Sequence, residues 1–396
     1  MGTELKFIHC ADLHLGSRFK GISDKDAELG HRLTEAVFSS FGRIVDLAIS
    51  EKADLLVISG DVFDEENETP STRYRFAKEL ERLDIPCMIA LGNHDHKRSW
   101  ESSIPYPENV HVFPSSPDRQ VIRVNNIPVE VLGRSFPSRH TGENLAQSLK
   151  GSPHMFTIAV VHCDLDPATN SPYAPCRLSE ILNNNVDYWA LGHIHERNVV
   201  CEHPSVVYPG NIQGRNSKES GEKGAYVVTV SGGSVSEIRF VPTQDILWTD
   251  IETDIGGKDL GSFINSIKSA SSPGSIISLR ISGRGELDAV LRLHPDETVA
   301  QISSATGCIV SSVELLTGPA IDLGSVSKNN GLVSKMMEAA QTIGSLPRGE
   351  LISRICSTRL SADIRDVFEE MSDDELKLVV RDAEMLLIEK LTEAYR

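Results

Sequence analysis

Five short polar motifs in the first half of the chain combine aspartate, asparagine and histidine. They are Asp12-Leu-His14, Gly60-Asp61-Val-Phe-Asp64, Gly92-Asn93-His94-Asp95, His162 in Val-Val-His-Cys, and Gly192-His193-Ile-His195. Carboxylate and amide oxygens mixed with neutral imidazole nitrogens suit manganese, iron or zinc better than calcium. No cysteine is among the candidate ligands in these motifs, which argues against a structural zinc site. The chemistry that these residue types favour is therefore catalysis assisted by metal ions.

The spacing within the motifs favours a pair of metals. In an extended backbone, residues i and i+2 project to the same side, and Asp12 with His14, like His193 with His195, has this spacing. Two metals ~3.5–4 Å apart could be held in this way. Each motif alone is weak evidence, since His162 could be an ordinary buried histidine and Gly-Asn-His-Asp an ordinary turn. Their joint occurrence predicts a dinuclear metal site.

Apolar runs of β type stand directly before the motifs and predict the elements that carry them. The runs are Leu5–Cys10, Leu55–Ser59, Cys87–Leu91, Phe156–Val161 and Tyr188–Leu191. A helical pattern covers residues 33–48, and Thr69 followed by Pro70 predicts the start of a second helix. Strands that alternate with helices predict an α/β layered domain over residues 1–244. Because ligands bind beyond the carboxyl ends of strands, we expect the five motifs to meet at one edge of one sheet.

The rest of the chain has a different organisation. Residues 245–320 predict a small α+β unit with strands at 247–251, 276–281 and 311–316. Residues 321–331 are rich in Gly, Ser and Asn and predict a linker. Residues 332–396 are acidic and helical, with a capping-box pattern from Ser372 to Glu375.

Composition narrows the class of protein. The chain has 396 residues, of which 40% are hydrophobic and 24% charged, as in globular proteins of two or three domains. Its net charge of −17 excludes a generic cationic nucleic-acid binder, so metal ions would have to create a positive field for an anionic substrate. Seven scattered cysteines without a CxxC pair, no membrane-length apolar run and no signal peptide predict a cytoplasmic location.

The order of the five motifs resembles that of the calcineurin-like metallophosphoesterase superfamily. Three further strings, Pro172–Cys176 (PYAPC), Asp187–His195 (DYWALGHIH) and Pro209–Arg215 (PGNIQGR), resemble the bacterial SbcD nuclease branch, and within it the YhaO-type DNA repair exonucleases. The resemblance covers residues 5–244. It implies a layered β-sandwich core flanked by helices, a small α+β capping domain that shapes a DNA groove, and a helical C-terminal tail.

The resemblance also implies roles for single residues. One metal would be held by Asp12, His14, Asp61 and His195, and the other by Asp61, Asn93, His162 and His193, so that Asp61 bridges the two. His94 would stabilise the transition state or protonate the leaving oxygen, and Asp64 would orient His94. Asp64 could equally be a solvated loop carboxylate. Arg215 is the best candidate for a phosphate contact among the basic loop residues, which also include Arg18, Lys20, Lys97, Arg98, Arg134 and Arg139.

The resemblance implies that the protein is a DNA nuclease with two divalent metal ions. Mn²⁺ is the expected metal, and Mg²⁺, Fe²⁺ and Zn²⁺ are alternatives. It would act in DNA end processing, repair or defence, as a homodimer and with an SMC-like ATPase of SbcC/YhaN type that contacts the tail at residues 332–396. Alternatively, the tail packs on the chain's own catalytic domain. Two other functions stay open: hydrolysis of a small phosphomonoester or cyclic nucleotide, and a binding subunit with a residual metal site.

Overall fold

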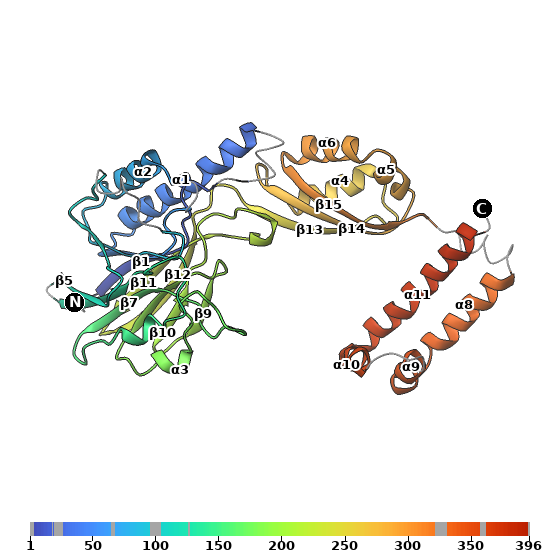
Figure 1. Ribbon diagram of the computed structural model, residues 1–396. Coiled ribbons are helices and arrows are strands. Elements are labelled where there is room, and N and C mark those ends of the chain that lie inside the picture. The colour runs from blue at the N-terminus through green and yellow to red at the C-terminus, as the bar shows by residue number, and fades with distance from the viewer. Residues whose placement is uncertain are drawn as a thin grey trace. The chain divides into compact units, whose positions relative to one another are not determined.

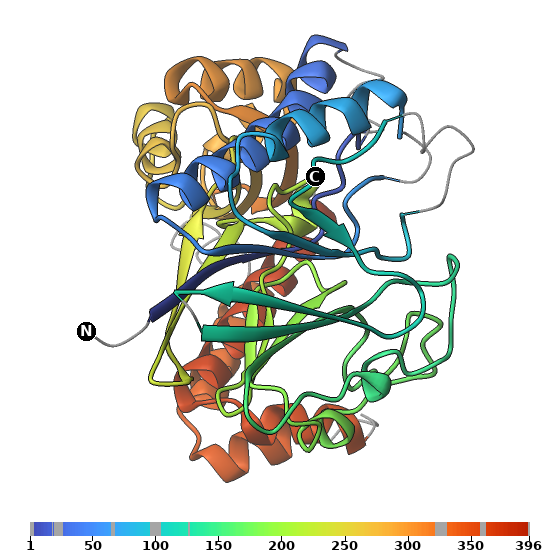
Figure 2. The ribbon, with the colours of Figure 1, turned by 90° about the vertical axis from the view of Figure 1, so that its left-hand side faces the viewer.

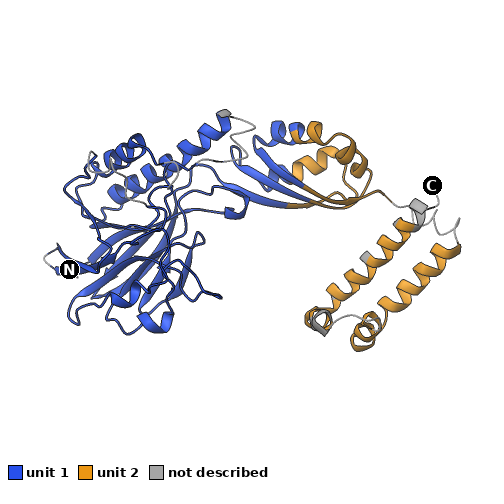
Figure 3. Ribbon diagram, viewed as in Figure 1, with its two compact units in different colours: residues 1–251, 267–280, 300–313 blue, residues 252–266, 281–299, 314–396 orange. Residues whose placement is uncertain are grey.

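The computed structural model describes residues 4–17, 19, 27–64, 68–95, 104–125, 127–320, 331–356 and 362–394. The chain divides into two compact units (Figure 3), one made of residues 1–251, 267–280 and 300–313 and the other of residues 252–266, 281–299 and 314–396. The predicted linker lies outside the described residues except for Gly331. The domain boundaries at residues 244 and 320 stay predictions.

The first unit contains a six-stranded sheet with the strand order β12-β11-β1-β2-β3-β4. Its strands are β1 (Glu4–Cys10), β2 (Leu55–Ser59), β3 (Cys87–Ala90), β4 (Val110–Val112), β11 (Gly224–Ser231) and β12 (Ser234–Pro242). Strands β1 to β4 are parallel, and β11 and β12 add an antiparallel edge. Three of the five predicted runs are thus neighbours in this sheet.

A second six-stranded sheet holds the other two predicted runs, in the order β5-β6-β7-β8-β10-β9. Its strands are β5 (Asp118–Val124), β6 (Ile127–Arg134), β7 (Phe156–His162), β8 (Tyr188–Gly192), β9 (Asn198–Cys201) and β10 (Ser205–Tyr208). The expectation that all five motifs meet at one edge of one sheet is therefore wrong. The motifs follow strands of two sheets.

The two sheets are stacked face to face (Figure 2). Their facing sides are apolar, since Phe7 and Val57 of the first sheet belong to the same buried cluster as Ile158 and Tyr188 of the second. Both central strands of the first sheet are buried on two sides, which explains why their sequences are continuous apolar runs.

Helices cover the outer face of the first sheet (Figure 1). They are α1 (Ala27–Ser50) and α2 (Pro70–Leu80), which bury Phe41 and Phe76 against it. The side chain of Thr69 accepts a hydrogen bond from the Thr72 N–H at 3.2 Å, so the predicted N-cap of α2 is confirmed. The outer face of the second sheet is covered by loops and two short helices, η2 (Ala146–Ser148) and α3 (Leu178–Ile181). The predicted β-sandwich flanked by helices is confirmed.

Residues 248–318 contain the three predicted strands of the α+β unit, with helices between them. Strands β13 (Trp248–Asp254), β14 (Ile276–Arg284) and β15 (Ile309–Gly318) pair in that order. The helices are α4 (Leu260–Ser269), α5 (Leu287–Leu293) and α6 (Pro295–Thr306).

The C-terminal region is helical, as predicted, and comprises α8 (Gly331–Gly344), α9 (Arg348–Ile355), α10 (Ala362–Glu370) and α11 (Asp373–Ala394). The capping box of α11 is formed: the Glu375 carboxylate accepts from the Ser372 N–H at 2.6 Å, and the Ser372 hydroxyl accepts from the Glu375 N–H at 3.3 Å. Leu351, Ile352 and Leu376 form a small apolar core within this region. Among the described helices, none is long and apolar enough to span a membrane.

Candidate metal centre

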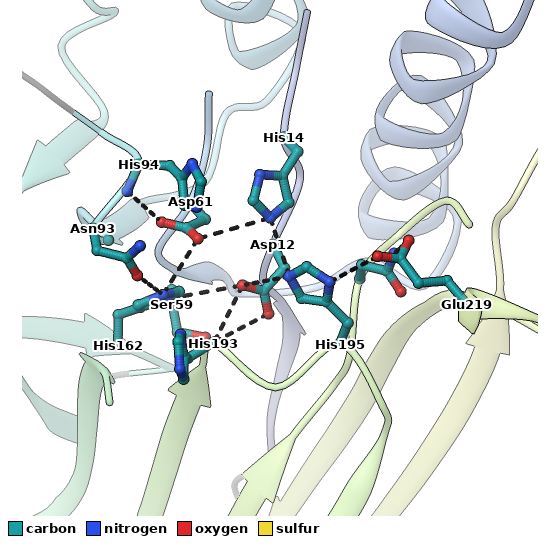
Figure 4. A network of polar contacts seen from close by, with 12 residues as sticks. Asp12, His14, Ser59, Asp61, Asn93, His94, His162, His193, His195 and Glu219 are labelled. Carbon is teal, nitrogen blue, oxygen red and sulfur yellow. Dashed lines mark hydrogen bonds and ion pairs between the residues drawn. The ribbon is translucent and has the colours of Figure 1, made fainter. Parts of the chain in front are cut away.

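All seven predicted metal ligands come together where the two sheets end (Figure 4). The first sheet contributes residues that follow β1, β2 and β3: Asp12, His14, Asp61 and Asn93. The second sheet contributes residues at the ends of β7 and β8: His162, His193 and His195. Loops that are far apart in sequence thus supply one site.

Four of these residues have a left-handed backbone, with φ of 51° at Asp12, 48° at His14, 49° at Asp61 and 107° at His193. Residues with a Cβ adopt such angles rarely and at a cost in free energy. Two backbone hydrogen bonds hold the first loops in place: the Asp12 N–H donates to the Gly60 carbonyl at 3.0 Å, and the His14 N–H donates to the Asp61 carbonyl at 2.9 Å. The strain is thus balanced by contacts between the loops themselves.

One group of donor atoms surrounds His14 and His195. Their Nε2 atoms face each other at 3.2 Å. The Nε2 of His14 lies 3.7 Å from Asp61 Oδ2, and the Nε2 of His195 lies 3.9 Å from Asp12 Oδ1. One donor atom from each of Asp12, His14 and His195 lies within 4.8 Å of the other two. Donor atoms this close together could hold a single metal ion.

A second group surrounds His162. Its Nδ1 donates to the Ser59 carbonyl at 3.0 Å, which leaves Nε2 as the ring nitrogen that could bind a metal ion. That Nε2 lies 3.1 Å from Asn93 Oδ1 and 3.4 Å from Asp61 Oδ2. Asp12, Asp61 and His162 also have donor atoms within 4.8 Å of one another.

His193 lies beside the second group and contacts two of its members, His162 and Asp12. Its ring lies 5.3 Å from the His162 ring, and its other neighbour is the Tyr173 ring at 5.0 Å. Its backbone N–H donates to the Asp12 carboxylate at 3.1 Å. The residue thus joins the loop after β8 to the loop after β1, while its imidazole belongs to none of the three groups of donor atoms found among the described residues.

The donor set fits divalent cations. The Asp12 and Asp61 carboxylates are almost completely buried, at 1% and 2% exposure. Burial raises the pKa of Asp12. Burial also acts to raise the pKa of Asp61, but the neighbouring His162 outweighs it and holds the pKa well below its usual range. Two buried carboxylates with imidazole and amide donors, and no cysteine, match the hard and borderline ligands of such ions.

His94 and Asp64 lie at the rim of the centre. The His94 side chain is 36% exposed, whereas that of His14 is 1% exposed. Its backbone N–H donates to Asp61 Oδ1 at 2.9 Å, and its ring lies 5.2 Å from the His14 ring. Its Nδ1 is 3.8 Å from Asp64 Oδ1, a distance for an ion pair rather than a hydrogen bond. The structure thus brings the predicted catalytic pair together beside the donor atoms.

Asp95 is a supporting residue to which sequence reasoning gave no role. Its carboxylate accepts from the backbone N–H groups of Gly92, Phe63 and Val62 at 2.8, 2.9 and 3.1 Å. It therefore fastens the loop that carries Asn93 to the loop that carries Asp61. Burial, and then the charge of Asp61, raises the pKa of Asp95 to about 7.

Arg215 and Glu219 form a charged pair next to His195. Glu219 ends the short helix η3 (Ser217–Glu219), and its Oε1 lies 3.2 Å from Arg215 Nη2 and 3.0 Å from His195 Nδ1. Burial acts to raise the pKa of Glu219, but the hydrogen bond from His195 and the charge of Arg215 outweigh it and lower the pKa. Sequence reasoning found Arg215 and missed Glu219.

The other basic candidates are less informative. Arg134 is paired with Glu143 at 2.8 Å, and Arg139 lines a cavity of about 530 Å³ beside the loop with Gly92 and Asp95. Four candidates lie outside the described residues: Arg18, Lys20, Lys97 and Arg98.

Replacing Gly92 by alanine should weaken metal binding. The added methyl group would collide with the Asp61 carboxylate and with the Asp61 backbone nitrogen, so the two loops cannot keep their present approach. We expect overpacking to lower the free energy of unfolding by about 1–3 kcal/mol. Thermal unfolding and calorimetric titration with Mn²⁺ measure the two effects. Gly142→Ala is the matched control, because a Cβ there meets no atom within 4 Å. Unchanged metal affinity in Gly92→Ala would contradict the prediction.

Comparison with known proteins agrees with the geometry. Residues 5–197 match the family model of the calcineurin-like phosphoesterases. The uncharacterized metallophosphoesterase YhaO of Bacillus subtilis is 37% identical over 263 residues, which cover 64% of this chain and 64% of that protein. The DNA double-strand break repair protein Mre11 of Sulfolobus acidocaldarius is 26% identical over 286 residues, covering 67% of this chain and 71% of that protein.

A second Mre11, from Methanosarcina acetivorans, is 26% identical over 334 residues, covering 79% of this chain and 51% of that protein. The match to YhaO covers 64% of that relative, which is less than two thirds of its length. The family resemblance that the five motifs indicate is confirmed, and the chain carries a calcineurin-like metallophosphoesterase domain.

Proposed function

We propose that this protein is a DNA nuclease that hydrolyses phosphodiester bonds at a centre of two divalent metal ions, with Mn²⁺ as the most suitable metal. The observation that carries the proposal is the convergence of two buried carboxylates, Asp12 and Asp61, with histidine and asparagine donors from both sheets. Relatives that are named as DNA double-strand break repair proteins support DNA as the substrate.

Each ion has its own set of proposed ligands. Asp12, His14, Asp61 and His195 hold one, and Asp61, Asn93, His162 and His193 hold the other. When bound, such ions supply positive charge that holds a phosphate and lowers the pKa of a water molecule. Two carboxylates against two divalent ions leave the centre positive, although the chain as a whole carries −17. This accounts for an acidic protein that binds a polyanion.

His94 is the proposed proton donor to the leaving oxygen. Its exposed ring at the rim can reach a bound substrate, while its backbone N–H is fixed on Asp61. Asp64, 3.8 Å from His94 Nδ1, orients the ring so that Nε2 faces the substrate.

Arg215 is the proposed phosphate contact on the other side of the centre. Its side chain keeps 20% exposure, and its Nη1 lies 3.5 Å from the Ser17 hydroxyl, in the loop that follows β1. A guanidinium at this place can donate to phosphate oxygens in two directions.

A nuclease assay with defined substrates tests the proposal. We expect linear duplex DNA to be cleaved with Mn²⁺ and to stay intact with EDTA. The comparison substrate is p-nitrophenyl phosphate. Hydrolysis of this small ester without cleavage of any DNA would overturn the proposal in favour of a small phosphomonoester or a cyclic nucleotide.

We further propose that the protein works as a homodimer and that its C-terminal helices dock onto an SMC-like ATPase. Several large apolar side chains of α10 and α11 are at least half exposed: Val367, Leu378, Leu386 and Leu387. An apolar helix face laid in a groove is a common mode of recognition between proteins. Light scattering of the purified protein tests the dimer.

A truncated chain that ends at residue 331 should keep its basal nuclease activity and should no longer bind the ATPase. Pull-down against a co-expressed ATPase of SbcC type measures the second effect, and a duplex-cleavage assay measures the first. Leu386→Asp in the full chain should reproduce the loss of binding, because it places a charge on the exposed face and leaves the buried Leu376 untouched. Full retention of the ATPase by a soluble truncated chain would exclude the docking role.

A further inference from the structure

We propose that Glu219 is a positioning residue of the metal centre, which fixes the tautomer of His195 and holds Arg215 beside it. This inference rests on the proposed function, since it assigns a role within the same centre. It arises from contacts made by one carboxylate that lies 24 positions after His195 in the chain.

The contact with His195 determines where its proton sits. Glu219 Oε1 lies 3.0 Å from His195 Nδ1. An ionised carboxylate only accepts hydrogen bonds, so this shorter contact favours a proton on Nδ1, whereas Arg215 Nη2 at 3.2 Å would favour a lone pair there. The Nε2 then presents a lone pair, and it faces His14 Nε2 at 3.2 Å and Asp12 Oδ1 at 3.9 Å. Carboxylate–histidine pairs of this kind orient metal ligands.

The carboxylate is itself held from the other side. Its Oε2 accepts from the Asn211 amide at 2.7 Å and from the Arg215 N–H at 2.9 Å. Asn211 is fully buried, and the Glu219 side chain is 11% exposed. Glu219 therefore keeps its place independently of His195, as a positioning group must.

The same carboxylate places Arg215. The Arg215 Nη2 donates to Glu219 Oε1 at 3.2 Å, and the same oxygen lies 3.0 Å from His195 Nδ1. The two nitrogen atoms that share this oxygen are 3.2 Å apart. The guanidinium balances the charge of Glu219, which means that Glu219 adds a fixed acceptor without adding net negative charge to the centre. The Glu219 carboxylate thus positions both the proposed phosphate contact, Arg215, and the proposed metal ligand, His195.

The tautomer is measured in the metal-free wild-type protein by long-range ¹H–¹⁵N correlation of the histidine rings, with His195→Gln to assign the signal. We expect the Nδ1–H form of His195. The Nε2–H form in the wild type would overturn the inference, whatever the fate of any variant.

Affinity for Mn²⁺, by calorimetry and by counting bound ions, gives the second readout. In Glu219→Ala we expect one of two ions to bind about 10- to 100-fold more weakly. Glu219→Gln keeps one acceptor oxygen for His195, so its loss should be smaller. Glu222→Ala is the matched control, because this exposed glutamate contacts Arg197 rather than the centre. Its affinity should equal that of the wild type.

The outcomes separate the two proposals. A wild-type protein that binds fewer than two ions contradicts the proposed metal centre. In the other outcome, the wild-type protein binds two ions and a folded Glu219→Ala variant binds them with unchanged affinity. This result agrees with the proposed metal centre and refutes the role of Glu219.

Discussion

The Asp61→Asn variant should lose DNA cleavage, and it should bind both metal ions more weakly. The carboxylate lies between the two donor groups, since its Oδ2 is 3.4 Å from His162 Nε2 and 3.7 Å from His14 Nε2. An amide keeps the shape but loses the charge and one acceptor oxygen. Replacement of a residue that only supports a metal ligand lowers metal affinity about 10- to 100-fold. Because Asp61 is itself a proposed ligand of both ions, we expect the affinity for each ion to fall by more than about 100-fold.

Elemental analysis after dialysis, together with a duplex-cleavage assay, measures the result for Asp61→Asn. Asp250→Asn is a suitable control, because this aspartate is exposed on β13. Retention of both ions at wild-type affinity in Asp61→Asn would show that Asp61 does not bridge them. Loss of one ion alone would assign Asp61 to a single site.

His94→Gln should lose activity and keep its metals. The ring is at the rim, with 36% exposure, and the interaction that ties residue 94 to Asp61 uses the backbone N–H, which the variant retains. Loss of a proton donor to the leaving oxygen costs roughly 10²- to 10⁴-fold in rate. The expected pattern is therefore a large fall in kcat with two ions still bound.

A substrate with a good leaving group sharpens the test of His94. A p-nitrophenyl phosphodiester needs little protonation of its leaving oxygen, so His94→Gln should impair its hydrolysis less than the cleavage of DNA. His154→Gln, at an exposed position, should change neither rate. Equal losses on the two substrates, or loss of metal, would contradict the role of proton donor.

The sequence predicted the strands of the site well because each is a buried apolar run that ends at a polar motif. The predicted strand Leu55–Ser59 agrees with β2 in every residue, and the predictions for β1, β3, β7 and β8 each differ by one residue at one end. It did not predict that β7 and β8 belong to a second sheet. A buried strand has the same pattern in either sheet, and the register of pairing is set by contacts between distant residues.

Supporting residues were harder to find than ligands. Glu219 follows no apolar run and lies in a short helical turn, so its sequence context resembles that of any exposed glutamate. In the last helix, Leu387 is 53% exposed, while its neighbour Ile388 is buried. One position of helical phase, about 100°, decides between the two, and pattern alone does not fix the phase.

The left-handed backbone at Asp12, His14, Asp61 and His193 has a consequence for the evolution of the gene. A residue with a Cβ costs roughly 1–2 kcal/mol more than glycine in this conformation, so selection for catalysis maintains four locally unfavourable residues. In a lineage that has lost the activity but still needs the folded protein, glycine should accumulate at these positions before the neighbouring apolar strands change. Glycine at positions 12, 14, 61 and 193 beside intact strands would thus mark a descendant that survives as a scaffold.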